Sequence, residues 1–170
     1  ILRPELCEGH LGTGRCTTGP NSHVNEHFVY LALSSEVKVG VTRSTQVPTR
    51  WIDQGASAAI KLAVVPYRKL AGDIEVNLKA HLTDKTSWQK MLKNEVGAYD
   101  LIQEKQKVKG LLAEHLREYL CEEDEVVNIN YPVIKYPEKI SSVGFEKFSV
   151  IEGKLTGIKG QYLIFEDNRV

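Results

Sequence analysis

Four polar side chains in the first half of the chain could together act on a phosphodiester: Tyr30, Lys38, Arg50 and Glu75. Cleavage of that bond needs an activated water, positive charge against the phosphoryl oxygens and help for the leaving oxygen. Glu75 is the candidate ligand for magnesium or another divalent cation, because a hard cation often takes one carboxylate and keeps several waters. Arg50 offers a planar cationic fork for a phosphate.

The other two groups have supporting roles in this interpretation. The Tyr30 phenol is a candidate to hydrogen-bond or deprotonate the attacking water, and Lys38 is a second cation or a base. Three of the four residues also have a plain structural alternative. A tyrosine in a hairpin usually packs, an arginine beside Trp51 commonly makes a surface or cation–π pair, and Glu75 can simply lie at the edge of the apolar stripe of its helix.

The elements that would position these groups follow from spacing. Two β-type runs separated by Ser34-Ser35-Glu36 predict a hairpin, and Pro48 predicts a short helix that carries Arg50 and ends at Gly55. The expected strands are 27–33, 37–42 and 58–65. Alternation along the first of these strands predicts two sides, one with Phe28, Tyr30 and Ala32 and the other with Val29, Leu31 and Leu33. The expected helices are 67–82, a short one through Trp88 to Leu92 capped by Thr83 or Asp84, and 100–120.

Three regions follow from the changes in pattern along the chain. Residues 1–25 are a loop-rich segment, residues 26–120 an α/β domain, and residues 121–170 a β-rich C-terminal extension with candidate strands at 126–134, 148–155 and 161–165. We therefore predict an α/β (α+β) fold, with a small mixed sheet flanked by helices. The sequence stops directly after a strand, which suggests a short version of something longer.

The N-terminal segment concentrates soft metal ligands. They are Cys7, His10, Cys16, His23 and His27. Their spacing resembles that of a structural zinc site, on loops with few apolar side chains to order them, and His23 or His27 would supply the fourth ligand. A reduced segment with free thiols is the alternative.

Composition limits the partners. The chain has 170 residues, of which 42% are hydrophobic and 26% charged, and its formal net charge is +0. Because no global field attracts a polyanion, a nucleic-acid partner must be held by a local patch. No apolar run predicts a membrane span, and three cysteines argue against a secreted disulfide scaffold, so we expect a cytoplasmic protein. Oligomeric state is not encoded.

The segments 29–31, 38–43 and 50–56 resemble an uncharacterised bacterial family known only as a domain of unknown function. Residues 71–75, 84–88 and 157–162 resemble its later signatures. The centre of that family is in turn similar to the GIY-YIG nuclease fold.

That second resemblance implies roles residue by residue. Tyr30 matches the first-motif tyrosine, Gly40 the second-motif glycine, Arg50 the arginine and Glu75 the metal glutamate. Thr42, Arg43 and Gln54 are implied as substrate-binding residues. Lys38 stands where the pattern has tyrosine, and Gln54 where many members have histidine or tyrosine.

Three functions follow as hypotheses. The first is a metal-dependent nuclease or phosphodiesterase acting on nucleic acid. The second is a GIY-YIG-like module that has lost cleavage and binds nucleic acid or protein. The third is a structural zinc-containing domain of a larger protein.

Overall fold

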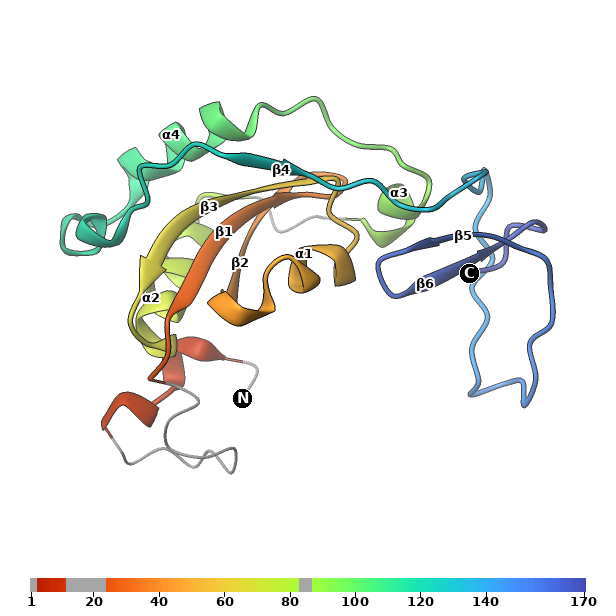
Figure 1. The fold of residues 1–170 in the computed structure, drawn as a ribbon, viewed down its shortest axis with the longest axis horizontal. Helices are drawn as coiled ribbons and strands as arrows, with labels where there is room; N and C mark the ends of the chain where they lie inside the picture. The colour runs from red at the N-terminus through yellow and green to blue at the C-terminus, as the bar shows by residue number, and fades with distance from the viewer. Residues whose placement is uncertain (1–2, 12–23, 83–86) are drawn as a thin grey trace.

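A four-stranded antiparallel sheet forms the centre of the protein. The computed structural model describes residues 3–11, 24–82 and 87–170, and Figure 1 shows their arrangement. The strand order is β2-β1-β3-β4, and a separate two-stranded sheet joins β5 to β6. The strands are β1 (His27–Leu33), β2 (Val37–Arg43), β3 (Ala58–Val65), β4 (Val126–Asn128), β5 (Leu155–Lys159) and β6 (Tyr162–Phe165). The predicted α+β class is confirmed, although every pairing in the four-stranded sheet is antiparallel where we expected a mixed sheet.

The β1–β2 hairpin separates two environments, because successive side chains of a strand point to opposite faces. Val29 and Leu31 belong to the main hydrophobic cluster, whereas Tyr30 and Ala32 belong to a second cluster with Trp51. This division agrees with the alternation seen in the sequence. It places Tyr30 on the face that also carries Arg50's helix.

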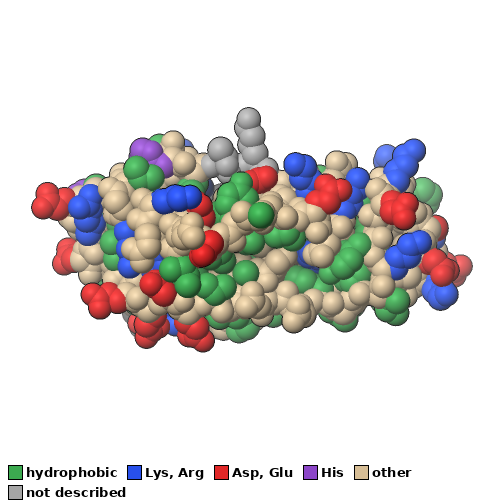
Figure 2. Space-filling view, turned by 90° about the horizontal axis from the view of Figure 1, so that it is seen from above, with side chains coloured by type: hydrophobic (Ala, Val, Ile, Leu, Met, Phe, Trp, Pro, Cys, Tyr) green, Lys and Arg blue, Asp and Glu red, His purple; other side chains and the backbone are tan. Residues whose placement is uncertain are grey.

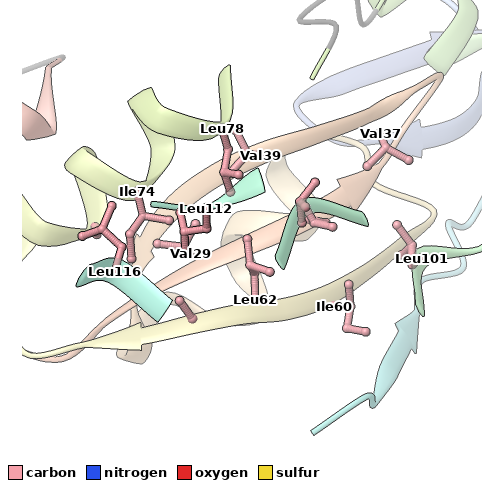
Figure 3. Close-up of a cluster of buried hydrophobic side chains, with 14 of the residues drawn as sticks. Val29, Val37, Val39, Ile60, Leu62, Ile74, Leu78, Leu101, Leu112 and Leu116 are labelled. Atoms are coloured by element: carbon pink, nitrogen blue, oxygen red, sulfur yellow. The ribbon is translucent and has the colours of Figure 1, made fainter. Parts of the chain in front are cut away.

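Helices cover both faces of the sheet. The α-helices are α1 (Thr49–Asp53), α2 (Arg68–Lys79), α3 (Trp88–Leu92) and α4 (Leu101–Leu111), and the 3₁₀ helices are η1 (Pro4–Leu6), η2 (Gly9–Leu11), η4 (Ser44–Gln46) and η5 (Glu114–Tyr119). Figure 3 shows Ile74 and Leu78 of α2 and Leu112 meeting Val29 and Val39 of the sheet. The main core therefore lies between the sheet, α2 and α4, and α1 packs on the other face.

The N-terminal residues pack against α2. A Cβ on Gly72 would lie 2.2 Å from the backbone nitrogen of Glu5, so only glycine allows η1 to come this close to the helix. Cys7 and Gly9 are buried in the same segment. The described part of the segment is thus ordered by packing on α2.

Several predicted boundaries are wrong for physical reasons. The helix expected over 100–120 ends at Leu111, because Leu112 takes an extended conformation and is buried, and η5 follows. The strand expected over 126–134 keeps only Val126–Asn128, the part that pairs with β3. No strand forms at 148–154, where Phe148 and Val150 are exposed and have no apolar face to cover. Ser87 caps α3, not Thr83 or Asp84, which lie outside the described residues.

The β5–β6 hairpin reaches back to the central sheet's α1 side, as Figure 1 shows. Gly160 at its tip has φ +61°, and a Cβ there would lie 2.9 Å from the Asp53 carbonyl oxygen at the end of α1. A small cluster of Met91, Leu92, Ile164 and Val170 joins the hairpin to α3. The C-terminal region therefore packs directly on the elements that carry Arg50 and Trp88.

The buried Lys159 of β5 also connects the C-terminal hairpin to the segment that follows α3. The Lys159 ammonium donates a hydrogen bond to Asn94 Oδ1 at 2.7 Å and lies over the rings of Tyr131 and Tyr136, 5.4 and 5.3 Å from their centroids. Tyr131 donates to the Ala56 carbonyl at 2.9 Å, just after α1.

Within the described part of the chain, no helix has both the length and the apolar character to cross a membrane.

Candidate functional site

A cleft of about 250 Å³ lies where the central sheet, α1, α3 and the tip of the β5–β6 hairpin meet. Lys38 and Arg50, the two cations singled out in the sequence, both line it, and so does Gln54. The cleft is also lined by two further polar side chains and by two aromatic rings, which are Asp53 and Gln161, and Trp88 and Tyr162, respectively. The structure thus brings three of the predicted site residues together and adds groups that the sequence did not indicate.

Local structure explains how these side chains converge. Lys38 lies on the edge strand β2, opposite Ala32, and therefore on the sheet face that carries Tyr30. Arg50 lies on α1, whose Trp51 is buried against Tyr30, with ring centroids 5.8 Å apart at 63°. Gln54 follows α1 directly, before Gly55 turns the chain with φ +71°. Burial of Trp51 fixes the direction in which this short helix presents Arg50.

Tyr30 lies beneath this cleft. Its side chain is 1% exposed and its hydroxyl accepts a hydrogen bond from Gln54 Nε2 at 3.1 Å. A Cβ on Gly40, the residue paired with Tyr30, would lie 2.6 Å from both Cζ and the hydroxyl oxygen. Gly40 therefore lets the ring lie across the edge strand, and the hydroxyl in turn orients the Gln54 amide.

Burial raises the pKa of the Tyr30 phenol, and this effect outweighs the opposing hydrogen bond from Gln54 and the positive charge of Arg50. The phenol therefore stays protonated at neutral pH. As a result the Tyr30 hydroxyl can hold the Gln54 amide by a hydrogen bond and orient a neighbouring group. Because it is not ionised at neutral pH, it cannot accept a proton as a general base would. Of the two roles predicted for Tyr30, hydrogen bonding fits this environment better.

Glu75 is placed differently. It lies on α2, whose Ile74 and Leu78 pack on the opposite face of the sheet from Trp51, and it does not line the cleft. Its carboxylate pairs with Lys79 at 3.4 Å, and its side chain is 13% exposed. Its negative charge nevertheless contributes to the raised pKa of Tyr30, as the smallest of the contributions. Glu75 is thus within electrostatic reach of the phenol without sharing the cleft.

The remaining predicted substrate-binding residues lie at the other end of β2. Thr42 is 7% exposed, and its hydroxyl donates to the Arg43 carbonyl at 3.3 Å. Arg43 is exposed at the end of the strand. Neither residue lines the cleft, so of the three residues implied by the resemblance only Gln54 does.

The proposed zinc ligands lie only partly within the described residues. Cys16 and His23 lie outside them. The His10 ring stacks on Tyr67, with centroids 4.7 Å apart, and its buried Nδ1 has no hydrogen-bond partner among the described atoms. Cys7 is buried, and His27 Nδ1 lies 2.6 Å from the Asn25 carbonyl oxygen.

Across residues 3–11, 24–82 and 87–170, no three histidine, cysteine or acidic side chains form a group able to hold a metal ion. The open His10 nitrogen and the Cys7 sulfur are donors that zinc prefers. Zinc binding by the N-terminal segment stays a prediction, and elemental analysis of the purified protein tests it.

Sequence reasoning missed Asp53, Gln161, Trp88 and Tyr162. The last two lie at ends of segments that resemble family signatures, but their pattern gave them no role. Their rings lie nearly parallel, at 7°, with centroids 5.9 Å apart. The available signals were an aromatic residue directly after the helix cap Ser87 and another two residues after the hairpin glycine Gly160.

Comparison with known proteins agrees with one prediction. A family model described as "Protein of unknown function (DUF2797)" matches residues 1–170. The predicted membership of an uncharacterised family is therefore confirmed, whereas the similarity to the GIY-YIG fold stays a prediction. No curated protein and no solved structure matches the chain.

Proposed function

The chain belongs to this family of proteins of unknown function, and from its cleft we propose that it binds nucleic acid through a backbone phosphate. The observation that carries the proposal is the convergence of Lys38 and Arg50, from a strand and a helix, on one cleft with the Gln54 amide. A guanidinium and an ammonium beside an amide donor match the oxygens of a phosphodiester in charge and in hydrogen-bonding capacity.

Electrostatics favours a small contact. Lys38 and Arg50 bring two positive charges to the cleft and Asp53 brings one negative charge, so the lining carries a net charge of +1. The whole chain is neutral, and Figure 2 shows both signs of charge interspersed over one face of the molecule. We therefore expect the cleft to engage one or two phosphates, with modest affinity that falls as salt rises.

Binding is favoured over catalysis because of Tyr30. Its phenol is buried and its pKa is raised, so it stays protonated at neutral pH and is poorly suited to act as a base. Its hydrogen bond with Gln54 suits a positioning role, in which one cleft amide is held ready for a phosphate oxygen.

Metal-dependent phosphodiester hydrolysis is the second candidate. The observation that favours it is that a carboxylate, Asp53, lines the same cleft as Lys38 and Arg50. A magnesium or other divalent cation near Glu75 would displace the ion pair with Lys79 and would keep most of its waters. Asp53 is the carboxylate that lines the cleft itself, so a cation bound beside Arg50 would meet Asp53 first.

Fluorescence anisotropy of labelled single-stranded DNA, single-stranded RNA and duplex DNA tests the binding proposal, over about 50 to 200 mM salt. We expect Arg50→Gln and Lys38→Gln each to weaken binding several-fold and to lower the salt slope by about 1. Lys147→Gln, which removes an exposed cation outside the cleft, is the matched control and should bind like wild type.

The outcome distinguishes the candidates. No binding to any of the three nucleic acids, or binding that neither Arg50→Gln nor Lys38→Gln changes, would refute the phosphate proposal. The same substrates incubated with magnesium or with a chelator test cleavage. If cleavage requires the metal and is abolished by Glu75→Gln or by Asp53→Asn, the second candidate function replaces the phosphate-binding proposal. The variant that abolishes cleavage then identifies the carboxylate that holds the cation.

A further inference from the structure

Two aromatic rings form one wall of the same cleft. Trp88 at the start of α3 and Tyr162 at the start of β6 lie nearly parallel, with an interplanar angle of 7° and centroids 5.9 Å apart. Both line the cleft that Lys38 and Arg50 line. Positive charge and π surface therefore meet in a space of about 250 Å³.

The two rings differ in exposure, and the difference suggests their use. Tyr162 is half-buried and packs against the small cluster that contains Met91 and Ile164, which holds its ring in place. Trp88 is 40% exposed although it stacks on Tyr162. A large aromatic surface that is supported from one side and open to water is suited to stacking by a flat ligand.

Phosphate and π surface side by side are what an unpaired nucleotide presents. A base inside a duplex is stacked on its neighbours and has no free face, whereas a base in a single strand can stack on a protein ring. We propose that the cleft takes single-stranded nucleic acid, with one base stacked on the Trp88–Tyr162 pair and the adjoining phosphate on Lys38 and Arg50. This inference rests on the proposed function and adds the class of substrate to it.

The distribution of tryptophan makes the proposal directly observable. The chain has two tryptophans, Trp51 and Trp88. Trp51 is 1% exposed in the core beside Tyr30, whereas Trp88 is in the cleft. Stacking of a base on Trp88 should therefore quench the solvent-exposed part of the emission and leave the Trp51 part unchanged.

Three probes separate stacking from phosphate binding. They are a short oligothymidylate, the matching oligouridylate, and a strand of the same length whose sugar–phosphate units carry no bases. We expect the two base-bearing strands to quench the fluorescence and to bind about ten-fold or more tightly than the baseless strand. Oligothymidylate annealed to its complement should bind no better than the baseless strand.

Variants assign the effect to the ring. Trp88→Ala should lose the quenching and bind the base-bearing strands about ten-fold more weakly, down to the affinity of the baseless strand. Trp88→Phe keeps a π face and should retain most of the affinity. Phe148→Ala removes a similarly exposed ring outside the cleft and is the matched control. Unchanged far-ultraviolet circular dichroism, which reports backbone structure, would show that Trp88→Ala is folded.

Each result has one meaning. If the baseless strand binds as tightly as oligothymidylate and Arg50→Gln weakens both, the phosphate proposal holds and base stacking is refuted. If no strand binds, the phosphate proposal fails and the stacking proposal fails with it. If the strands bind and Trp88→Ala matches wild type for all of them, stacking on this ring pair is refuted.

Discussion

Replacing Gly40 by alanine tests how the cleft is built. The new Cβ would lie 2.6 Å from Cζ and from the hydroxyl oxygen of Tyr30, a separation that carbon and oxygen do not tolerate. Tyr30 has little room to give, because its side chain is 1% exposed and its ring packs on Trp51. Either the ring must move off the edge strand or the two strands must separate.

The size of the effect follows from three contributions. Overpacking a core costs about 1–3 kcal/mol. Loss of the hydrogen bond from Gln54 to Tyr30 adds roughly 1 kcal/mol. The substitution also removes a flexible glycine from a strand, which stabilises by about 0.5–1 kcal/mol. We therefore expect Gly40→Ala to lower the free energy of unfolding by about 2 kcal/mol.

Urea unfolding followed by circular dichroism measures this change, and a double-mutant cycle identifies its cause. In a Tyr30→Leu background the atoms that meet the new Cβ are absent, so only the gain from removing the glycine remains and Gly40→Ala should stabilise by about 0.5–1 kcal/mol. An effect of the same size in both backgrounds would show that contact with Tyr30 is not the source. Gly40→Ala that is as stable as wild type would refute the reasoning outright.

Three further predictions concern other parts of the fold. Gly110→Ala in α4 should stabilise the protein by about 0.5 kcal/mol in urea unfolding, because a Cβ there has no heavy atom within 4 Å and alanine favours helix; destabilisation would contradict this. Gly72→Ala should push η1 off α2, because the new Cβ would lie 2.2 Å from the backbone nitrogen of Glu5. The backbone amides of residues 5–7 should then exchange faster with deuterium, and unchanged exchange would contradict this packing. Burial lowers the pKa of Lys159 from 10.5 to about 8, so between these values the unfolded chain binds more protons and stability should rise with pH. From pH 7 to 9.5 the rise should be larger in wild type than in Lys159→Met, by up to about 2 kcal/mol, and the comparison with Lys159→Met removes the contribution of other titrating groups. Parallel stability curves would refute it.

Local pattern sufficed for the hairpin, for the strand at 58–65 and for the helix after Pro66. Alternation in 27–33 predicted which side chains of β1 are buried together, since the period of a strand is two. The strand at 58–65 and the helix after Pro66 also agree with the structure within a few residues. The helix predicted over 100–120 was too long, because the structure ends it at Leu111. Leu112 has an extended backbone and is buried in the core instead of continuing the helix.

The candidate site was only partly accessible to such reasoning. Lys38, Arg50 and Gln54 come from neighbouring elements of one supersecondary unit, so their order along the chain already indicated their proximity. Tyr162 reaches the cleft because the tip of the C-terminal hairpin packs on the end of α1, where a Cβ on Gly160 would meet the Asp53 carbonyl. Trp88 of α3 lines the cleft beside it and stacks on its ring. No periodicity describes a contact between segments so far apart.

Glu75 shows the limit most clearly. Its helical spacing predicted a position at the edge of a buried stripe, and it is half-buried there. The spacing carries no information about which face of the sheet the helix covers, and α2 covers the face opposite Trp51.

The sequence by itself therefore determined the β1–β2 hairpin and the burial of β1 on both faces. It also determined that two cations and an amide lie near one end of the hairpin. These features depend on interactions between residues that are close in the chain. Only the tertiary structure decided that an aromatic pair and Asp53 share their cleft while Glu75 does not. That choice depends on how whole helices and a distant hairpin pack against the sheet, and packing of that kind is set by shape complementarity over many residues at once.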